Sequence, residues 1–395
     1  MTGSQTDSFE MLATTLFGLE DVLAGELEEA GAASIEKLNR AVSFSGDKKL
    51  LYRLNLSSRT ASKFLVPVRK RQVLSDRDLY SAAMDVDWWK YLDVDKTFAV
   101  DSVVNSKHFN HSKYAALKVK DAIADRFREK YGKRPSVDRE NPDVRVNVHI
   151  DRERCAISLD SSGEPLHRRG YRLEGRGAPL NEVLAAGMIM LTGWRGEGGF
   201  IDPMCGSGTL PVEAALIAGN RAPGFLRKRF GFFGWNDFDA ALFARVSDEL
   251  ANRARTPASE IRGSDVSKRA VETARSNIRR ARLEKTVKIQ AGAFERVDPP
   301  PAPGILVMNP PYGRRMGSGD IVEFYKMIGD TLKRKYEGYQ AWILSANFDA
   351  MKFIGLRPSK KITLFNGPLE CRFQRYEVYG GSKKAKYRSD ESEKQ

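Results

Sequence analysis

The stretch GFIDPMCGSGT, residues 199–209, decides the fold class of this chain. Its first residues are apolar and typical of a short buried strand, and a helical pattern follows the turn over residues 210–218. A strand, a glycine-rich turn and a helix make the first unit of a doubly wound sheet, which binds its ligand at the carboxyl end of the strand. Gly206 and Gly208 allow the backbone to approach that ligand more closely than a Cβ atom would permit.

This turn favours a nucleoside ligand over a dinucleotide. Pro211 stands where the dinucleotide fingerprint has its third glycine. Asp202 places a carboxylate where it can face the positive methionine end of S-adenosylmethionine, whereas it would repel a pyrophosphate. The next predicted strand, residues 261–264, leads to Asp265, and an acidic residue there can accept both ribose hydroxyls. We predict an S-adenosylmethionine site, with Thr209 as the N-cap of the following helix.

A second motif, Asn309-Pro310-Pro311-Tyr312, directly follows an apolar strand pattern at residues 305–308. The side-chain carbonyl of Asn309 and the backbone carbonyl of Pro310 can both accept hydrogen bonds from one amine, and proline has no N–H to donate. The ring of Tyr312 can stack on the planar group that carries the amine. We therefore predict that these four residues catalyse the alkylation of a planar exocyclic nitrogen.

Strands and helices alternate through the second half of the chain. The strand patterns are at residues 199–202, 261–264, 287–290, 305–308 and 340–345. Helical patterns between them predict an α/β fold with a mostly parallel sheet. Residues 361–365 and 372–379 are predicted to close this sheet as an antiparallel pair.

The first half mixes helices and strands without regular alternation. Residues 144–150 alternate apolar and polar side chains, and residues 155–159 do the same after a short turn, which predicts a hairpin. A long amphipathic helix is predicted over residues 112–131. This mixture indicates a compact α+β module for RNA, preceded by a small ferredoxin-like piece.

The composition favours a polyanionic partner. Lys and Arg number 65 against 51 Asp and Glu, which gives a net charge of +14 and a pI near 9.6. A generically basic protein is the plain alternative. The three cysteines are widely spaced, which suggests a reducing compartment. No apolar run reaches the roughly eighteen residues that a membrane helix needs, so we expect a cytoplasmic protein.

Histidines offer only a weak metal signal. His108 and His111 have a spacing seen in metal sites, but no second pair of ligands accompanies them. We therefore expect a surface loop there and no bound metal.

Longer motifs resemble those of the RlmL-type family. They are LHRRGYR (166–172), APLNE (178–182), DPMCGSGTLPVEAA (202–215), APG (222–224), NPPYG (309–313) and NGPLECR (366–372). Members of that family carry an N-terminal THUMP RNA-binding domain and methylate guanine N2 in large-subunit (23S) ribosomal RNA. The resemblance implies a class I, Rossmann-like methyltransferase domain with a seven-stranded sheet, preceded by ferredoxin-like and THUMP domains.

The implied domain boundaries follow the shifts in composition. They are 1–65 for the ferredoxin-like subdomain, 66–164 for the THUMP domain and 165–381 for the methyltransferase domain. The polar segment 382–395 is expected to be a disordered tail. The chain has no room for a second methyltransferase domain after Gly381, so we expect it to modify one kind of site.

The resemblance also implies which residues bind S-adenosylmethionine. They are Asp202, Met204, Cys205, Gly206, Ser207, Gly208, Thr209, Asp265, Val266, Ala293, Phe294 and Asn309. Ala293 departs from the family pattern, because many relatives carry Asp there to bind the adenine amine. Adenine would then be held by backbone groups, by Phe294 or by Glu295. The implied partner is 23S ribosomal RNA, either free or in a pre-ribosomal particle.

Two basic segments are candidates for RNA contact. They are Arg168, Arg169 and Arg172 in the expected connection between the halves, and Arg227, Lys228 and Arg229 in an insertion rich in aromatic residues. Cations beside aromatic rings suit an RNA backbone and unstacked bases. The alternatives are a solvated linker for the first segment and a flap packed on the methyltransferase domain for the second.

Other functions share parts of these patterns. The same clamp occurs in enzymes that methylate adenine N6 in RNA or DNA and in enzymes that methylate glutamine side chains. A DNA enzyme needs a sequence-reading domain, and no recognition helix or zinc module is evident. A non-catalytic, RNA-binding ribosome assembly factor is a further alternative. Cys205 could be a nucleophile, but its place in the cofactor turn favours a structural role.

Overall fold

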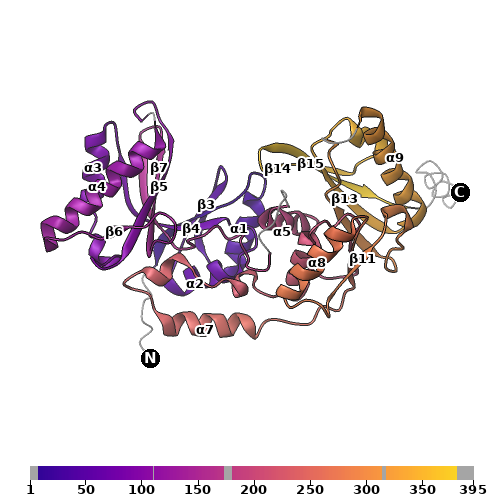
Figure 1. Cartoon of the computed structure of the whole chain (residues 1–395), viewed down its shortest axis with the longest axis horizontal. Helices are drawn as coiled ribbons and strands as arrows, with labels where there is room; N and C mark the ends of the chain where they lie inside the picture. Colours follow the sequence, from indigo (N-terminus) through magenta and orange to yellow (C-terminus); the bar gives the residue numbers. More distant parts are fainter. Residues whose placement is uncertain (1–7, 110, 173–179, 314–316, 380–395) are drawn as a thin grey trace, which may run out of the picture. The chain divides into compact units, whose positions relative to one another are not determined.

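The computed structural model describes residues 8–109, 111–172, 180–313 and 317–379. The chain folds as two compact units. The first unit joins residues 1–170 to residues 222–252, and the second joins residues 171–221 to residues 253–395. The chain therefore passes from one unit to the other three times (Figure 1). The tail predicted for residues 382–395 lies outside the described residues.

One eight-stranded sheet runs through the first unit. Its strands are β1 (Phe9–Thr14), β2 (Ala33–Leu38), β3 (Ala41–Gly46), β4 (Lys63–Gln72), β5 (Thr97–Asn105), β6 (Ser136–Val137), β7 (Val144–Asp151) and β8 (Arg154–Asp160). Their order in the sheet is β2-β3-β1-β4-β8-β7-β5-β6. Strand β4 pairs with β1 on one side and with β8 on the other, so a single sheet joins the two successive modules that the sequence predicted.

Strand β4 is an element that the sequence patterns did not predict. It contains Pro67, and proline is usually absent from central strands because it cannot donate to the hydrogen-bond ladder. The register of β4 against β8 shifts between Pro67 and Arg69, which places the proline at an irregularity of the ladder. The bulge explains how a central strand accommodates this residue.

Four helices complete the N-terminal part of the first unit. They are α1 (Glu20–Ala30), α2 (Lys48–Ser57), α3 (Asp76–Met84) and α4 (Ser112–Tyr131), with a 3-10 turn η1 (Trp88–Lys90) after α3. Helix α4 has the predicted bounds and ends at Gly132, whose φ of 68° lies in the left-handed region. Helices α3 and α4 lie side by side, and α4 contacts β5 (Figure 1).

The insertion belongs to the first unit and packs onto it. It contains two 3-10 turns, η2 (Pro223–Leu226) and η3 (Gly231–Gly234), and helix α7 (Ala240–Ala251), which contacts α2 (Figure 1). The ring of Phe232 lies 4.6 Å from that of Tyr52, and its N–H donates to the carbonyl of Ser161 at 3.1 Å. This corrects the flap alternative, because the aromatic side chains fill the core of the N-terminal unit.

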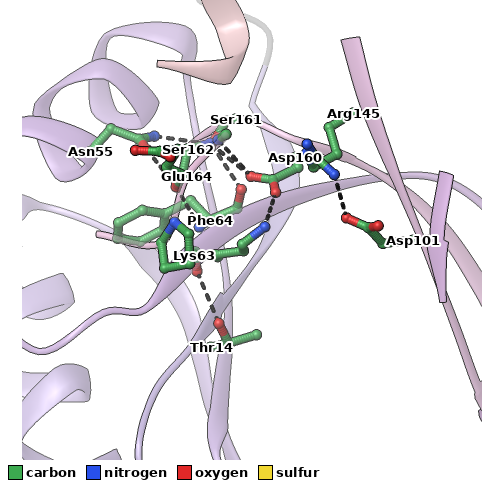
Figure 2. Close-up of polar contacts among 12 residues, drawn as sticks. Thr14, Asn55, Lys63, Phe64, Asp101, Arg145, Asp160, Ser161, Ser162 and Glu164 are labelled. Carbon is green, nitrogen blue, oxygen red and sulfur yellow. Dashed lines mark hydrogen bonds and ion pairs between the residues drawn. The ribbon is translucent and has the colours of Figure 1, made fainter. Parts of the chain in front are cut away.

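Buried polar contacts hold the end of β8 beside β4 (Figure 2). The Asp160 carboxylate accepts the N–H of Ser162 at 3.0 Å and pairs with the Lys63 ammonium. Burial raises the pKa of the Asp160 carboxyl, and Lys63 opposes that rise. The Asn55 side chain donates to Ser161 Oγ at 2.9 Å and accepts from Ser162 Oγ at 2.7 Å. These bonds satisfy polar groups that burial would otherwise leave without partners.

The second unit is an α/β fold around a seven-stranded sheet, as predicted. Its strands are β9 (Gly199–Asp202), β10 (Ile261–Asp265), β11 (Val287–Ala291), β12 (Gly304–Met308), β13 (Tyr339–Ser345), β14 (Lys360–Asn366) and β15 (Leu369–Glu377). Their order is β11-β10-β9-β12-β13-β15-β14. Strands β9 to β13 pair in parallel, and β15 is antiparallel to both of its neighbours.

Helices of the second unit alternate with these strands along the chain. They are α5 (Glu182–Leu191), α6 (Thr209–Ala218), α8 (Lys268–Arg280) and α9 (Ser318–Lys335), with 3-10 turns η4 (Phe294–Arg296) and η5 (Ala350–Ile354). Across the described residues, no helix is both long and apolar enough to cross a membrane. The same residues contain no cluster of three or more His, Cys, Asp or Glu side chains that could hold a metal ion.

Candidate active site

The carboxyl ends of three adjacent parallel strands converge at one edge of the second unit. Strand β9 pairs with β10 on one side and with β12 on the other. The strand order reverses between β9 and β12, and ligands of doubly wound sheets bind at such a reversal. The glycine turn follows β9, Asp265 ends β10, and Asn309 follows β12. The two sequence motifs therefore meet at one place.

The glycine turn after β9 has a backbone that only glycine adopts easily. Gly206 and Gly208 have φ values of 53° and 81°, in the left-handed region. A Cβ atom on Gly208 would lie 3.0 Å from the Cβ of Ala274 in α8, whereas none of the surrounding heavy atoms would come within 4 Å of one on Gly206. The side chain of Asn277, also in α8, donates to the Ser207 carbonyl at 2.9 Å. Helix α8 thus fixes one side of the turn, and open space remains beside Gly206.

The prediction that Thr209 caps α6 is wrong. Gly208 occupies the N-cap position, and Thr209 is the first helical residue. The Thr209 hydroxyl instead accepts a hydrogen bond from Arg172 at 2.8 Å. Arg172 also pairs with Glu182 at 3.1 Å, so its guanidinium braces the start of α6. These contacts engage the Arg172 guanidinium within the second unit.

Asp265 ties the end of β10 to the glycine turn. Its carboxylate oxygens accept the N–H groups of Gly206 and Ser267, each at 2.9 Å. Each carboxylate oxygen can accept a further hydrogen bond, so both remain able to bind ribose hydroxyls. The next side chain, Val266, is 76% exposed although it is apolar. A flat apolar ligand lying over Val266 would cover that surface.

Asp202 is a buried carboxylate at the tip of β9. Its side chain is 2% exposed and accepts the Met204 N–H at 3.2 Å. Burial raises the pKa of this carboxyl well above its ordinary value, and the neighbouring charge of Asp265 raises it further. Among the described residues, no Lys, Arg or His forms an ion pair with Asp202. A cationic ligand group would supply the missing positive charge.

In the loop after β11, backbone groups are more available to a ligand than side chains are. The Gly292 N–H donates to the Asp265 carbonyl at 3.0 Å, which keeps this loop beside Asp265. Ala293 precedes the turn η4 and is partly exposed. Phe294 is 3% exposed, and its ring packs 5.3 Å from that of Tyr336. The Phe294 ring belongs to the core, so the backbone of this loop and Glu295 remain as the predicted adenine contacts.

The clamp after β12 contains a hydrogen bond that the sequence did not predict. The Tyr312 hydroxyl donates to Asn309 Oδ1 at 2.6 Å. Burial raises the pKa of the Tyr312 phenol above its ordinary value, so the hydroxyl keeps its proton at neutral pH. A carbonyl oxygen has two lone pairs, so Asn309 Oδ1 retains one acceptor position for a substrate amine.

Residues from the far edge of the sheet support this clamp. Asn366 at the end of β14 donates to the Tyr312 hydroxyl at 3.3 Å, and the Cys371 thiol of β15 lies 3.7 Å from the same oxygen. Asn347, after β13, donates to the Tyr312 carbonyl at 3.2 Å. Tyr325 of α9 donates to the Pro311 carbonyl at 3.3 Å. The sequence marked Asn366 and Cys371 only as parts of the motif NGPLECR, because nothing local ties that hairpin to Tyr312.

Cys205 is a buried residue of the glycine turn. Its side chain is 6% exposed, and its N–H donates to the Ser264 carbonyl at 2.9 Å. Burial raises the pKa of the thiol, and the carboxylates of Asp202 and Asp265 act in the same direction. A thiol kept protonated is a poor nucleophile, which argues against a nucleophilic role for Cys205.

The remaining residues predicted to contact RNA fall into two groups, one engaged inside the first unit and one exposed to solvent. Arg169 is 2% exposed and donates to the carbonyls of Leu166 and Arg59. Arg227 donates to backbone carbonyls of the segment 162–168, and burial lowers the pKa of its guanidinium to about 10. Both guanidinium groups are thus used inside the first unit.

The other three cations of this set face solvent. Arg168 pairs with Glu164 at 2.7 Å, and Arg229 pairs with Asp143 at 3.0 Å. Lys228 is exposed. Because exposed ion pairs exchange partners at little cost, these side chains remain able to meet a phosphate.

Comparison with known proteins identifies the family. Residues 169–375 match the family model described as "RMKL-like, methyltransferase domain", which covers more than half of the chain. This chain belongs to the RMKL-like methyltransferase family. Residues 75–160 match the THUMP domain, and residues 10–65 match the RlmL ferredoxin-like domain. The family resemblance and the fold class predicted from the sequence are confirmed.

Curated relatives agree with this assignment. A "Putative RNA methyltransferase slr0064" of Synechocystis sp. is 39% identical over 93% of this chain and 96% of its own length. A "Ribosomal RNA large subunit methyltransferase K/L" of Syntrophotalea carbinolica is 40% identical over 93% of this chain. That match covers 53% of the relative, so this chain spans about half the length of the K/L proteins.

Solved structures superpose on nearly the whole chain. The protein SMU.472, described as "a putative methyltransferase complexed with SAH", is 29% identical, with a TM-score of 0.85 over 95% of this chain and 99% of its own. A "predicted N6-adenine-specific DNA methylase" of Listeria monocytogenes is 28% identical, with a TM-score of 0.83 over 95% and 97%.

Proposed function

We propose that this enzyme transfers a methyl group from S-adenosylmethionine to the exocyclic N2 amine of a guanine in large-subunit ribosomal RNA. The observation that carries the proposal is the juxtaposition of an amine clamp at Asn309 with the carboxylates of Asp202 and Asp265 on adjacent strands. The K/L relatives are named for large-subunit ribosomal RNA, and a THUMP domain occupies the first unit. Such a substrate places the enzyme in the cytoplasm.

The residues around the glycine turn suit the chemical groups of S-adenosylmethionine. Asp202 would face its positive methionine end, and Asp265 would accept its ribose hydroxyls. Val266 and the backbone after β11 would line the adenine. The space beside Gly206 gives the ligand a close approach to the backbone. When bound, S-adenosylmethionine supplies an electrophilic methyl group on a sulfonium.

The clamp residues position the guanine amine. Its nitrogen is conjugated with the ring and is a weak nucleophile, so orientation contributes more than deprotonation. Asn309 Oδ1 and the Pro310 carbonyl accept its two N–H bonds and turn the nitrogen lone pair toward the methyl donor. The same oxygens stabilise the positive charge that develops on nitrogen, and the amine proton then leaves to water. Holding the partners in line contributes on the order of several kcal/mol.

Access requires the target nucleotide to leave its helix. The amine of a paired guanine cannot be approached in line, so the base must be flipped out or lie in an opened loop. The exposed cations Arg168, Lys228 and Arg229 are proposed contacts for the surrounding RNA. The net charge of +14 suits this polyanionic substrate.

Nucleoside analysis tests the proposal. The protein is incubated with labelled S-adenosylmethionine and ribosomal RNA from a strain that lacks the modification, and the digested RNA is separated by chromatography. We expect label in N2-methylguanosine. Label in N6-methyladenosine would replace the guanine assignment by the activity that the Listeria relative's name suggests. Binding of RNA without transfer would favour an assembly factor.

A further inference from the structure

A cation stacked on an aromatic ring lies beside the amine clamp. The guanidinium of Arg372 on β15 is 4.3 Å from the ring centre of Phe348, in the loop after β13. Arg372 is exposed, and Phe348 is partly exposed. This pair, which we call the Arg372–Phe348 pair, belongs to none of the contacts assigned above.

The pair is attached to the clamp through the neighbours of both residues. Cys371 precedes Arg372, and its thiol lies 3.7 Å from the Tyr312 hydroxyl. Asn347 precedes Phe348, and its side chain donates to the Tyr312 carbonyl at 3.2 Å. Because consecutive Cα atoms are about 3.8 Å apart, both members of the pair lie close to the clamp.

The strand register places Arg372 on the face of the sheet that carries Ser345, which is opposite to the face of Cys371. Arg372 lies directly opposite Ser345, and opposite residues of an antiparallel pair share a face. The Ser345 hydroxyl is 2.6 Å from that of Tyr325, which donates to the Pro311 carbonyl. A chain of contacts therefore leads from Ser345, the cross-strand partner of Arg372, to Pro311 of the clamp.

The guanidinium of Arg372 is held without an anionic partner. Within the described part of the chain, no carboxylate forms an ion pair with it and no carbonyl accepts its hydrogen bonds. Arg227 also stacks on a ring, that of Phe230 at 5.2 Å, but its donors are occupied by backbone carbonyls. Stacking fixes the Arg372 plane while its edge stays open to solvent.

We propose that the Arg372–Phe348 pair is a binding site for an RNA phosphate that flanks the modified nucleotide. The inference rests on the proposed function, because it takes the clamp as the place where the target base enters. A planar guanidinium matches a phosphate with two parallel hydrogen bonds, and the ring beneath it limits its motion. The phosphate contact fixes the register of the flipped nucleotide and carries no sequence information itself.

RNA binding by charge variants tests this site. The probe is an in vitro transcript of large-subunit ribosomal RNA, and its dissociation constant is measured by fluorescence anisotropy across a range of salt concentrations. We expect Arg372→Ala to weaken binding about five- to tenfold and to reduce the salt slope by roughly one. Arg372→Lys should recover part of the loss, because it keeps the charge but loses the planar fork.

The matched control is Lys288→Ala on β11, at the opposite edge of the same sheet. Lys288 is exposed and pairs with Glu260, so its loss removes one surface charge far from the hairpin. We expect this variant to bind RNA within about twofold of the wild type. Affinity for adenosyl-homocysteine should be unchanged in all three variants.

Two results would overturn the site. One is RNA affinity of Arg372→Ala equal to that of Lys288→Ala. The other is a loss of adenosyl-homocysteine affinity in Arg372→Ala that matches its loss of RNA affinity, which would show a packing role. A wild-type enzyme that binds the transcript but makes no N2-methylguanosine would reject the proposed function, whereas the comparison of variants would still decide whether the phosphate site exists.

Discussion

The loops after β9 and β12 begin on adjacent strands but are held in different ways. The glycine turn after β9 is held through its backbone groups, because the Gly206 N–H donates to Asp265 of β10 and the Ser207 carbonyl accepts from Asn277 of α8. The clamp after β12 is held by side chains of β14, β15 and the loop after β13. The comparison shows that the glycine turn is fixed through its backbone groups, whereas the clamp is fixed largely through the Tyr312 hydroxyl.

Asn309→Ala is the variant expected to distinguish the functions of the two loops most strongly. Loss of the oxygen that accepts the amine should lower kcat by about 10²–10³-fold, the size found when one group that stabilises developing charge is removed. Affinity for adenosyl-homocysteine should change little, because the glycine turn has its own supports. Single-turnover transfer assays and calorimetry measure the two quantities. Turnover near the wild-type rate would remove Asn309 from the reaction.

The converse variant is Asp265→Ala, which targets the loop after β9. Its carboxylate accepts two N–H groups in the protein and is proposed to accept the ribose hydroxyls. Hydrogen bonds to a charged group contribute about 1.5–3 kcal/mol, so affinity for adenosyl-homocysteine should fall roughly 10- to 100-fold. At saturating S-adenosylmethionine, kcat should recover in large part. A fall in kcat that saturation does not restore would show that the two loops are not separable.

Asn366 contacts the clamp through the Tyr312 hydroxyl, so substitutions of these two residues should not have independent effects on kcat. Tyr312→Phe keeps the ring but removes the hydroxyl that joins Asn309 to Asn366, and Asn366→Ala removes the donor to that hydroxyl. Each should lower kcat about three- to tenfold, from a hydrogen bond worth about 0.5–1.5 kcal/mol. The double variant should be no slower than Tyr312→Phe, since both act through one hydroxyl.

A variant on the same strand controls for general disruption of the hairpin. Thr363 of β14 is exposed, and Thr363→Ala should leave kcat unchanged. Additive losses in the double variant of Tyr312 and Asn366 would contradict the shared hydroxyl.

The smallest effect is a pH dependence at the cofactor end. Burial raises the pKa of Asp202, and a cationic ligand favours the carboxylate. Affinity for adenosyl-homocysteine should therefore fall as the pH is lowered through the raised pKa and should be constant above it. Asp202→Asn should bind more weakly at high pH and lose this dependence. Calorimetry between about pH 5 and 8 measures the affinity of the wild type and of Asp202→Asn for adenosyl-homocysteine. If the affinity depends on pH equally in both proteins, the titrating group is not Asp202.

The same contrast explains what the sequence could predict. The strand, glycine turn and helix of residues 199–218 are contiguous, so their pattern predicted the fold and the turn with Asp202. Asp265 was predicted separately, from its place at the end of the next strand. The amine clamp was also predicted, because Asn309-Pro310-Pro311-Tyr312 is contiguous. The cap at Thr209 was mispredicted, because Gly208 takes the non-helical cap position. The hydroxyl bridge was not predicted, because it joins Tyr312 to a hairpin whose approach depends on the order of the whole sheet.

The basic residues show that composition alone does not identify which side chains can contact RNA. Arg169, Arg172 and Arg227 lie in cationic motifs that indicated RNA contact, yet each guanidinium donates to groups inside the protein. Arg372 drew no attention as a cation, because a single arginine in a strand carries no pattern. Its exposure and its aromatic support emerge only when β13 and β15 are paired. The burial and the hydrogen-bond partners of each arginine distinguish the first three from Arg372, whereas a count of charges does not.

A crystal structure of the protein with adenosyl-homocysteine tests the central claim most directly. We expect the sulfur of the ligand to lie in front of Asn309 Oδ1 and the Pro310 carbonyl. We expect its ribose to contact Asp265 and its methionine end to point toward Asp202. A ligand bound away from these residues would contradict the account, as would a clamp closed off by side chains in that complex.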